Sequence, residues 1–246
     1  MKHFLLSFFS FIALSVSAAA PIVDFVTPSI VRVRWNPEGL ATDNATGICT
    51  YTPQHVNIQQ ERRGELTIMK SDSLTVLLGD DGNIIFLAER GGLPVAGLQT
   101  YLPKPYSCDT VVRERIVYDE SSARMEDTAN GKVTVKDVLS RDTIGTSRKF
   151  KVSFLTYEDE AMYGLGSHME DYMNLEGKTL YLTQHNLKAF VPMIVSNGGF
   201  GLLFDAGCSM KFESKPIDKP SYDETPTEYE TSMELEAANT MDYYFI

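Results

Sequence analysis

Cysteine, histidine and tryptophan are scarce in this sequence, and their scarcity argues against several kinds of site. The 246 residues include three cysteines, four histidines and one tryptophan. Three cysteines are too few for a disulfide scaffold, and no Cys-x-x-Cys pair indicates a redox or zinc centre. The sequence also lacks His-x-His, His-Glu-x-x-His and a calcium-binding loop. Cys49, Cys108 and Cys208 either form one bridge with one thiol left over or are small buried side chains. We expect no metal and no cofactor.

Positive charge is in deficit as well. Lysine and arginine number 22 against 33 aspartates and glutamates, which gives a formal net charge of −11. So acidic a chain argues against nucleic acid or an anionic membrane surface as a partner. Long apolar runs are also missing after residue 20, where no segment approaches the roughly 20 residues that a membrane-spanning helix needs. We therefore expect no nucleic-acid partner and no membrane insertion.

The first 20 residues are typical of a secretory signal peptide. Lys2 and His3 give a short basic start, and the apolar run 4–16 has the length of a signal-peptide core. Small residues favour cleavage after Ala18 or Ala19. The sequence therefore predicts an exported protein, either secreted or periplasmic.

Short alternating strands recur along the rest of the chain, whereas no long window has a helical period. Apolar and basic side chains alternate over residues 30–35, and the turn residues 79–83 predict a hairpin between strands 74–78 and 84–87. Further strands are expected at 66–68, 111–118, 132–138, 149–157, 180–183, 192–196, 200–204, 230–235 and 240–246. Many short strands joined by turn residues predict an all-β sandwich or barrel.

The stretch 163–205 combines glycine-punctuated apolar runs with polar loops. Glycines at this density indicate tight turns or a backbone that passes close to another group. Polar side chains gathered on loops above an apolar scaffold are typical of binding sites. The candidates are His168, Glu170, Asp171, Asn174, Gln184, His185 and Asn186.

Five short motifs follow one another in this stretch. They are Tyr-Gly-Leu-Gly at 163–166, Asn-Leu-x-Gly-Lys at 174–178, Gln-x-Asn at 184–186, Val-Pro at 191–192 and Gly-Phe-Gly-Leu-Leu-Phe-Asp at 199–205. Their order resembles the N-terminal domain of glycoside hydrolase family 31, which includes α-glucosidases and α-xylosidases. The resemblance extends from Ile30 to the C-terminus. It implies a galactose mutarotase-like β-sandwich with many short antiparallel strands.

The resemblance also implies how the chain is divided. Residues 1–20 would be the signal peptide, 21–240 the sandwich, and 241–246 the start of the connection to a catalytic (β/α)₈ barrel. That barrel would be the sandwich's partner. Exposed side chains of Tyr243, Tyr244 and Phe245 are expected to form the edge that contacts it.

The catalytic carboxylates of that family have no counterpart in this sequence. A glycosidase needs two carboxylates flanking the sugar, about 5 Å apart for retention and wider for inversion. The family's nucleophile lies on the barrel in a Trp-x-Asp-Met-Asn-Glu type motif, whereas Trp35 is followed by Asn-Pro-Glu and no Asp-Met-Asn occurs. We therefore assign no catalytic residue to this chain, and hydrolysis of α-glycosidic bonds would belong to the full-length enzyme.

A supporting role is what the resemblance implies for the sandwich. One of the family's loops from this domain reaches the rim of the sugar pocket, and residues 167–174 match it best. His168 and Asp171 are the predicted contacts to a sugar hydroxyl. The alternative is that both only cap the turn or bond to neighbouring backbone. For Gln184 and Asn186 this structural alternative is favoured, because amides commonly bridge loop backbone groups.

Two other functions are left open by the sequence. An aldose epimerase, suggested by the mutarotase-like fold, needs an acid and a base across a hexose, for which His168, His185 and Glu170 are candidates. A stand-alone carbohydrate-binding sandwich needs exposed aromatic platforms. The tyrosines considered for that purpose are Tyr101, Tyr106, Tyr172 and Tyr181.

Overall fold

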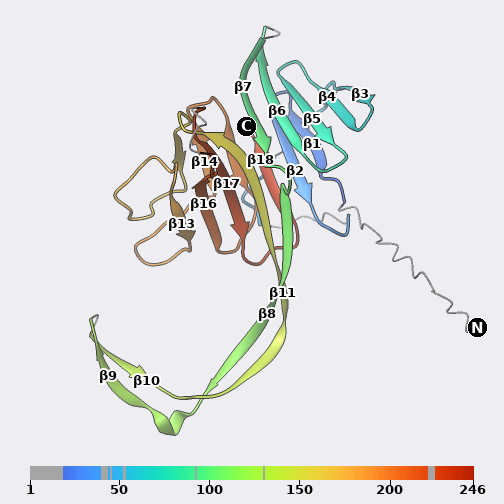
Figure 1. The fold of residues 1–246 in the computed structure, drawn as a ribbon. Coiled ribbons are helices and arrows are strands. Elements are labelled where there is room, and N and C mark those ends of the chain that lie inside the picture. Colours follow the sequence, from blue (N-terminus) through green and yellow to red (C-terminus); the bar gives the residue numbers. More distant parts are fainter. Residues whose placement is uncertain are drawn as a thin grey trace, which may run out of the picture.

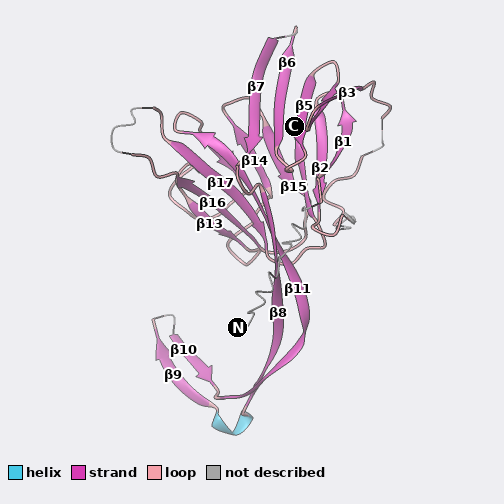
Figure 2. Ribbon diagram, turned by 45° about the vertical axis from the view of Figure 1, so that its right-hand side comes forward, coloured by secondary structure: helices cyan, strands magenta, loops and turns pink. Residues whose placement is uncertain are grey.

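The computed structural model describes residues 19–39, 44, 46–51, 54–91, 93–129, 131–220 and 225–246. The predicted signal peptide therefore lies outside the described residues, apart from Ala19 and Ala20. Within the described ranges, no helix is long and apolar enough to cross a membrane. Strands β1 to β18 and one short 3₁₀ turn make up the regular structure (Figures 1 and 2). The prediction of an all-β fold is confirmed.

The first sheet has six strands, and each pairs with its neighbours in antiparallel fashion. In spatial order they are β1 (Ile22–Thr27), β2 (Ile30–Trp35), β18 (Met241–Phe245), β15 (Gly201–Phe204), β14 (Met193–Ser196) and β12 (Met162–Gly164). The strand that ends the chain, β18, is thus an interior strand between β2 and β15.

The second sheet is larger and also antiparallel. Its order is β13 (Thr179–Leu182), β16 (Met210–Pro216), β17 (Glu228–Leu235), β11 (Val138–Tyr157), β7 (Leu93–Thr100), β6 (Ile84–Arg90), β5 (Leu74–Gly79), β4 (Leu66–Lys70) and β3 (Gln59–Arg63). The remaining strand, β8 (Tyr106–Tyr118), pairs with β11 outside this order. The two sheets face each other as a sandwich.

The period-two pattern of the sequence accounts for how the strands are placed. In β2, Val31, Val33 and Trp35 are buried in the core, while the arginines between them lie on the other face. The predicted hairpin between β5 and β6 is present, and Gly82 takes a φ of 84° in its turn. Local alternation and turn chemistry therefore fix these elements.

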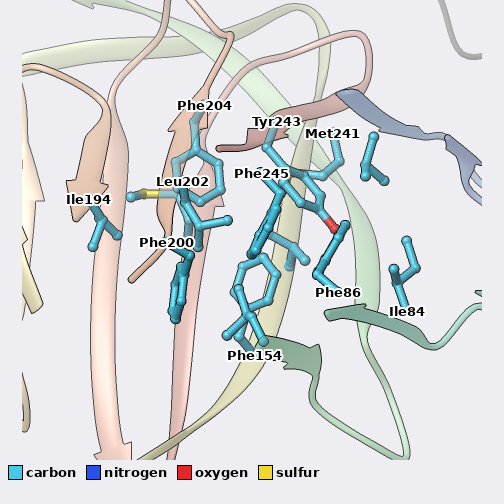
Figure 3. Packing of buried hydrophobic residues seen from close by; sticks show 14 of the residues in the cluster. Ile84, Phe86, Phe154, Ile194, Phe200, Leu202, Phe204, Met241, Tyr243 and Phe245 are labelled. Atoms are coloured by element: carbon cyan, nitrogen blue, oxygen red, sulfur yellow. The ribbon is translucent and has the colours of Figure 1, made fainter. Parts of the chain in front are cut away.

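An aromatic core fills the space between the sheets (Figure 3). The rings of Phe86 from β6 and Phe245 from β18 stack at 4.5 Å, and Phe154 from β11 meets Tyr243 edge-on at 5.5 Å. The hydroxyls of Tyr243 and Tyr106 are hydrogen-bonded at 2.8 Å in the interior. Because β18 supplies two of these rings, it is part of the core that joins the sheets.

The prediction that β18 ends in an exposed contact edge is wrong. Tyr243, Tyr244 and Phe245 are 0%, 4% and 1% exposed. Two of them face the core, and Tyr244 on the opposite face is covered by a loop, whose Tyr51 ring lies edge-on at 6.2 Å. A central strand of a sheet that is covered on both faces is largely apolar on both faces. An exposed strand that binds a partner has the same sequence pattern, so the pattern alone does not distinguish the two.

The predicted strands at 111–118 and 149–157 belong to one long hairpin, which we call the arm (residues 109–149). Here β8 and β11 continue well beyond the sandwich, and Figures 1 and 2 show the ribbon curving away from it. The 3₁₀ turn (Glu120–Ser122), β9 (Arg124–Thr128) and β10 (Gly131–Val135) form its far end. The strand expected at 132–138 is wrong in extent, because β10 ends at Val135 and β11 starts at Val138.

The three cysteines are free thiols and half-buried. Burial is the largest influence on each, and it raises the pKa of Cys49, Cys108 and Cys208 above the ordinary value of a thiol. Of the two arrangements left open by the sequence, the structure has the one without a bridge. Raised thiol pKa values also argue against a nucleophilic role for these side chains.

Candidate functional site

The predicted site residues lie on two loops that run side by side at the edge of the first sheet. One loop, residues 165–178, follows β12, and the other, 183–192, joins β13 to β14. Backbone hydrogen bonds link them at Leu165 N to Met193 O (2.8 Å), Ser167 N to Ala189 O (2.8 Å) and Ala189 N to Ser167 O (3.1 Å). The two loops therefore continue the β12–β14 ladder past its end, and we call them the paired loops.

Two glycines allow β12 and β14, and the paired loops that adjoin them, to approach each other this closely. A Cβ atom on Gly164 would lie 2.3 Å from Met193 O, and one on Gly166 would lie 2.3 Å from Ala189 O. Both glycines have positive φ, 128° and 78°. The close approach expected from the glycine pattern is confirmed, and the group that is approached is the neighbouring loop's own backbone.

Left-handed backbone at two larger residues marks the start of the first loop. Leu165 has a φ of 62° and is completely buried, and Met169 has a φ of 60°. Such conformations cost about 1–3 kcal/mol each and persist where the surroundings enforce them. Here the burial of Leu165 and the ladder to Met193 fix the loop, so the residues that follow are held in a defined position.

His168 points inward from this strained turn. It is 9% exposed, its ring lies 5.7 Å from that of Tyr172, and its Nδ1 is enclosed without a hydrogen-bond partner among the described residues. Asp171, three residues later, is exposed. The two side chains predicted to bind sugar thus lie in different environments. Neither side chain makes a hydrogen bond with the described residues, and the turn is stabilised by Asn174.

Asn174 is the amide that stabilises the loop. Its Oδ1 accepts hydrogen bonds from the backbone N–H groups of Met162 and Glu176, both at 3.1 Å. The side chains of Gln184 and Asn186, for which a similar role was expected, are exposed and make no hydrogen bond with the described residues. That expectation is wrong for both, since neither side chain bonds a backbone group of the described residues.

One ion pair joins the paired loops at their surface. Glu170 of the first loop and Lys188 of the second form an ion pair at 3.4 Å. His185 is exposed, and its Nδ1 accepts a long hydrogen bond of 3.5 Å from the backbone of Leu187. Glu170 is thus engaged by lysine, and no observed contact links it to His168 or His185 as epimerase chemistry would require.

Exposed apolar side chains surround this site and were missed from the sequence. Met169 and Met173 of the first loop are 59% and 79% exposed, and Leu187 and Val191 of the second are 66% and 52% exposed. Next to them, Tyr163 and Val195 form a cross-strand pair on the outer face of the sheet. The sequence signal for this surface was the presence of apolar residues within polar loops. An exposed apolar cluster commonly marks a contact site.

The four tyrosines considered as sugar platforms differ in how far they are buried. Tyr106 is a core residue, stacked on Trp35 at 5.2 Å, so its prediction as a platform is wrong. Tyr101 and Tyr172 are half-buried. Tyr181 on β13 is 64% exposed, with the Lys211 ammonium 5.7 Å from its ring centre. Among the four, Tyr181 alone presents an open ring.

Comparison with known proteins gives these features a context. No protein-family model matches the chain. An uncharacterised family 31 glucosidase of Pseudescherichia vulneris is 23% identical over 155 residues, which are 63% of this chain and 27% of that protein. The family 31 α-xylosidase of Xanthomonas citri matches 93% of this chain and 37% of its own, with a TM-score of 0.66 and 15% identity. This chain is homologous to family 31 glycosidases over part of their length.

The same partial match recurs in a second family 31 structure. The dextranase of Flavobacterium johnsoniae matches 94% of this chain and 26% of its own, with a TM-score of 0.57 and 14% identity. The fold is the sandwich of the family 31 N-terminal domain. The chain spans between about a quarter and somewhat more than a third of these family 31 proteins, with shares of 27%, 37% and 26%.

Proposed function

We propose that this chain is the non-catalytic N-terminal sandwich of a family 31 α-glycosidase, and that the catalytic carboxylates lie on a barrel outside this sequence. One observation carries the proposal. More than nine-tenths of this chain matches the X. citri α-xylosidase, of which it covers 37%. The absence of the family's nucleophile motif from the 246 residues agrees with it. The activity would then belong to the whole enzyme, with the sandwich supporting the barrel.

Within that enzyme, we assign the paired loops to the rim of the sugar pocket. The ladder and the glycine contacts hold the loops rigidly, which a binding site needs. Because Nδ1 of His168 is enclosed, its imidazole would bond a sugar hydroxyl through Nε2, beside the exposed carboxylate of Asp171. The exposed Met169 and Met173 would cover the less polar face of a sugar ring or the surface of the barrel.

The sugar is proposed to be an α-linked glucose or xylose. A family 31 α-xylosidase from a soil metagenome is known in complex with xylose, and the F. johnsoniae dextranase in complex with glucose. Both proteins match over 90% of this chain, with TM-scores of 0.58 and 0.57. These two complexes support the class of sugar, a glucose or a xylose.

The first experiment is to measure the size of the native gene product, by intact mass or by immunoblot against residues 21–246. We expect a species several times heavier than the 27.5 kDa of this chain. That species should hydrolyse aryl α-glucosides or α-xylosides, while the 246-residue chain alone should not. A mature product near the mass of this chain would contradict the proposal and would favour the stand-alone sugar-binding sandwich, with Tyr181 as its platform.

The loop assignment is tested in the active full-length enzyme. His168→Gln and Asp171→Asn should each raise KM about 2- to 12-fold, the equivalent of one hydrogen bond of about 0.5–1.5 kcal/mol, with little change in kcat. Gln184→Ala, an exposed side chain on the neighbouring loop, is the matched control and should leave KM unchanged. An active enzyme whose KM is the same in all three variants would remove the paired loops from the pocket without affecting the rest of the proposal.

A further inference from the structure

The outer half of the arm has strand edges that nothing covers in the described part of the chain. There, β8 pairs with β11 on one side and with no strand on the other. From Thr110 to Tyr118 the backbone of β8 runs without a register shift, over a length of about 30 Å at about 3.3 Å per residue. On the opposite strand, register shifts at Leu139 and Ile144 interrupt β11. Bulges of this kind make an edge unsuitable for pairing, so the regular edge belongs to β8.

A two-stranded ribbon is marginally stable in water unless a third strand or another surface packs against it. The arm also exposes large apolar side chains along its length. On β8, Val112, Ile116 and Tyr118 share one face and are 55%, 37% and 47% exposed, and Val111 on the other face is 38% exposed. A long, regular and partly apolar edge strand is a template for a further strand.

Charge distinguishes the arm from the rest of the molecule. Residues 109–149 contain eight acidic and eight basic side chains, so the arm is neutral, whereas the chain as a whole carries −11. Two sandwiches of this chain repel each other through that excess of negative charge. The arm is therefore the part of the molecule that can approach a second copy without this repulsion.

We propose that the chain forms a homodimer in which the β8 strands of two copies pair in antiparallel fashion across a two-fold axis. Such an axis stands perpendicular to the joined sheet and lies midway between the two copies of one residue. Only then do directly opposed side chains point to the same side of the sheet. With Glu114 on the axis, Val112 faces Ile116 of the partner subunit and Val111 faces Val117 of the partner subunit. With Arg113 or Arg115 on the axis, apolar side chains would face charged ones.

Two of the charges near the axis are already paired within each arm. Glu114 is paired with Arg141 at 3.5 Å, and Arg115 with Asp142 at 3.2 Å. Each copy of Glu114 therefore meets its counterpart as half of an ion pair, and Asp142 neutralises Arg115, which faces Arg113 of the partner subunit. A second copy also supplies what the edge lacks, an open strand of the same kind. A (β/α)₈ barrel has a closed inner sheet surrounded by helices and offers no such edge.

The mass of the chain in solution, by light scattering across a concentration series, tests the dimer. We expect a dimer for the natural sequence and a monomer for Val112→Lys/Ile116→Lys, with unchanged circular dichroism. The control is Leu93→Lys/Val95→Lys at the tip of the β6–β7 hairpin, where the side chains are more exposed, at 70% and 55%. That variant should remain a dimer. A natural chain that is monomeric at every concentration, or a control that also becomes monomeric, overturns the proposal.

A cysteine on the two-fold axis tests the register. Glu114→Cys should form a disulfide with its own counterpart under mild oxidation, because directly opposed Cβ atoms lie about 4.5–5.5 Å apart. Thr110→Cys faces Tyr118 of the partner subunit and should not crosslink beyond the level of the natural chain. Equal crosslinking of the two variants overturns the pairing. A second result would also overturn the pairing: the chain is monomeric, and its arm amides are protected from hydrogen exchange only in a longer gene product. The rest of that product would then cover the arm.

Discussion

The carboxylate of Asp242 accepts two hydrogen bonds from the guanidinium of Arg32, at 2.9 Å from Nε and 2.5 Å from Nη2. The pair joins β18 to β2 on the face of the first sheet that turns away from the core, and the Asp242 side chain is fully buried there. A loop that precedes β3 covers this face, with Tyr51 against Tyr244. The outer side of the sheet is thus a second, polar interior whose stability depends on keeping its charges paired.

Removing Arg32 should therefore be costly in a pH-dependent way. We expect Arg32→Met to lower the free energy of unfolding by about 3–5 kcal/mol at pH 7, because it leaves the Asp242 carboxylate buried and unpaired. Urea unfolding measures this. Arg62→Met removes the half-exposed ion pair between Arg62 and Asp80 and is the matched control, with an expected cost of about 0–1 kcal/mol. Equal costs for the two variants would contradict the importance of the buried pair.

The direction of the pH dependence follows from the pKa of Asp242. Burial raises that pKa above its ordinary value, although Arg32 acts to lower it. The folded state thus holds the proton more tightly than the unfolded state. This contribution to stability is complete below a pH of about 3.9 and is lost as pH rises through the raised pKa. In Arg32→Met the pKa should rise further, so the cost of the substitution should shrink from pH 7 to pH 4. A cost that is constant over this range would count against it.

The contact between Gly166 and the neighbouring loop makes a second prediction. Gly166→Ala should cost about 3 kcal/mol, because the added Cβ would meet Ala189 O at 2.3 Å. Gly64→Ala is the control, since Gly64 also has a positive φ, 60°, but an added Cβ would have nothing within 4 Å. It should cost about 1 kcal/mol, the penalty of left-handed backbone alone. Thermal unfolding of both variants separates the two effects, and equal shifts in Tm would show that the close contact relaxes freely.

The position of Trp35 predicts where the signal peptide is cleaved. Its indole Nε1 donates a hydrogen bond to Ala19 O at 2.8 Å, and the side chain is 5% exposed. Cleavage after Ala19 would remove this acceptor and leave a largely buried N–H unpaired, at about 1–3 kcal/mol. Of the two expected sites, we therefore favour cleavage after Ala18, and we predict that the mature protein starts at Ala19. Mass spectrometry of the exported protein tests this, and a start at Ala20 or at Met1 would contradict it.

Strand placement is the part of the fold that the sequence predicts best. The alternation in 30–35 and the turn at 79–83 correspond to β2 and to the β5–β6 hairpin. The strands that the sequence did not place are β1, β3, β7, β9, β12 and β16. Of these, β1, β3 and β12 lie at sheet edges, and Pro94 and Gly97 interrupt the pattern of β7. For the candidate site, the motifs located the paired loops and their close approach. They did not predict that His168 points inward or that Asn174 caps the turn.

By itself, the sequence determined the all-β class, the turns, the resemblance to the family 31 N-terminal domain and the lack of its nucleophile motif, since each of these depends on residues near one another in the chain. Only the tertiary structure decided that β18 is central and that Tyr244 is covered. It also decided that the outer edge of the arm is left uncovered by the described residues. Burial of both faces of a strand depends on segments about 200 residues away, such as the loop that holds Asn44 against Asp205 O and Thr240 O. A period-two pattern specifies which side chains share a face, whereas the contacts of distant segments specify whether that face is covered.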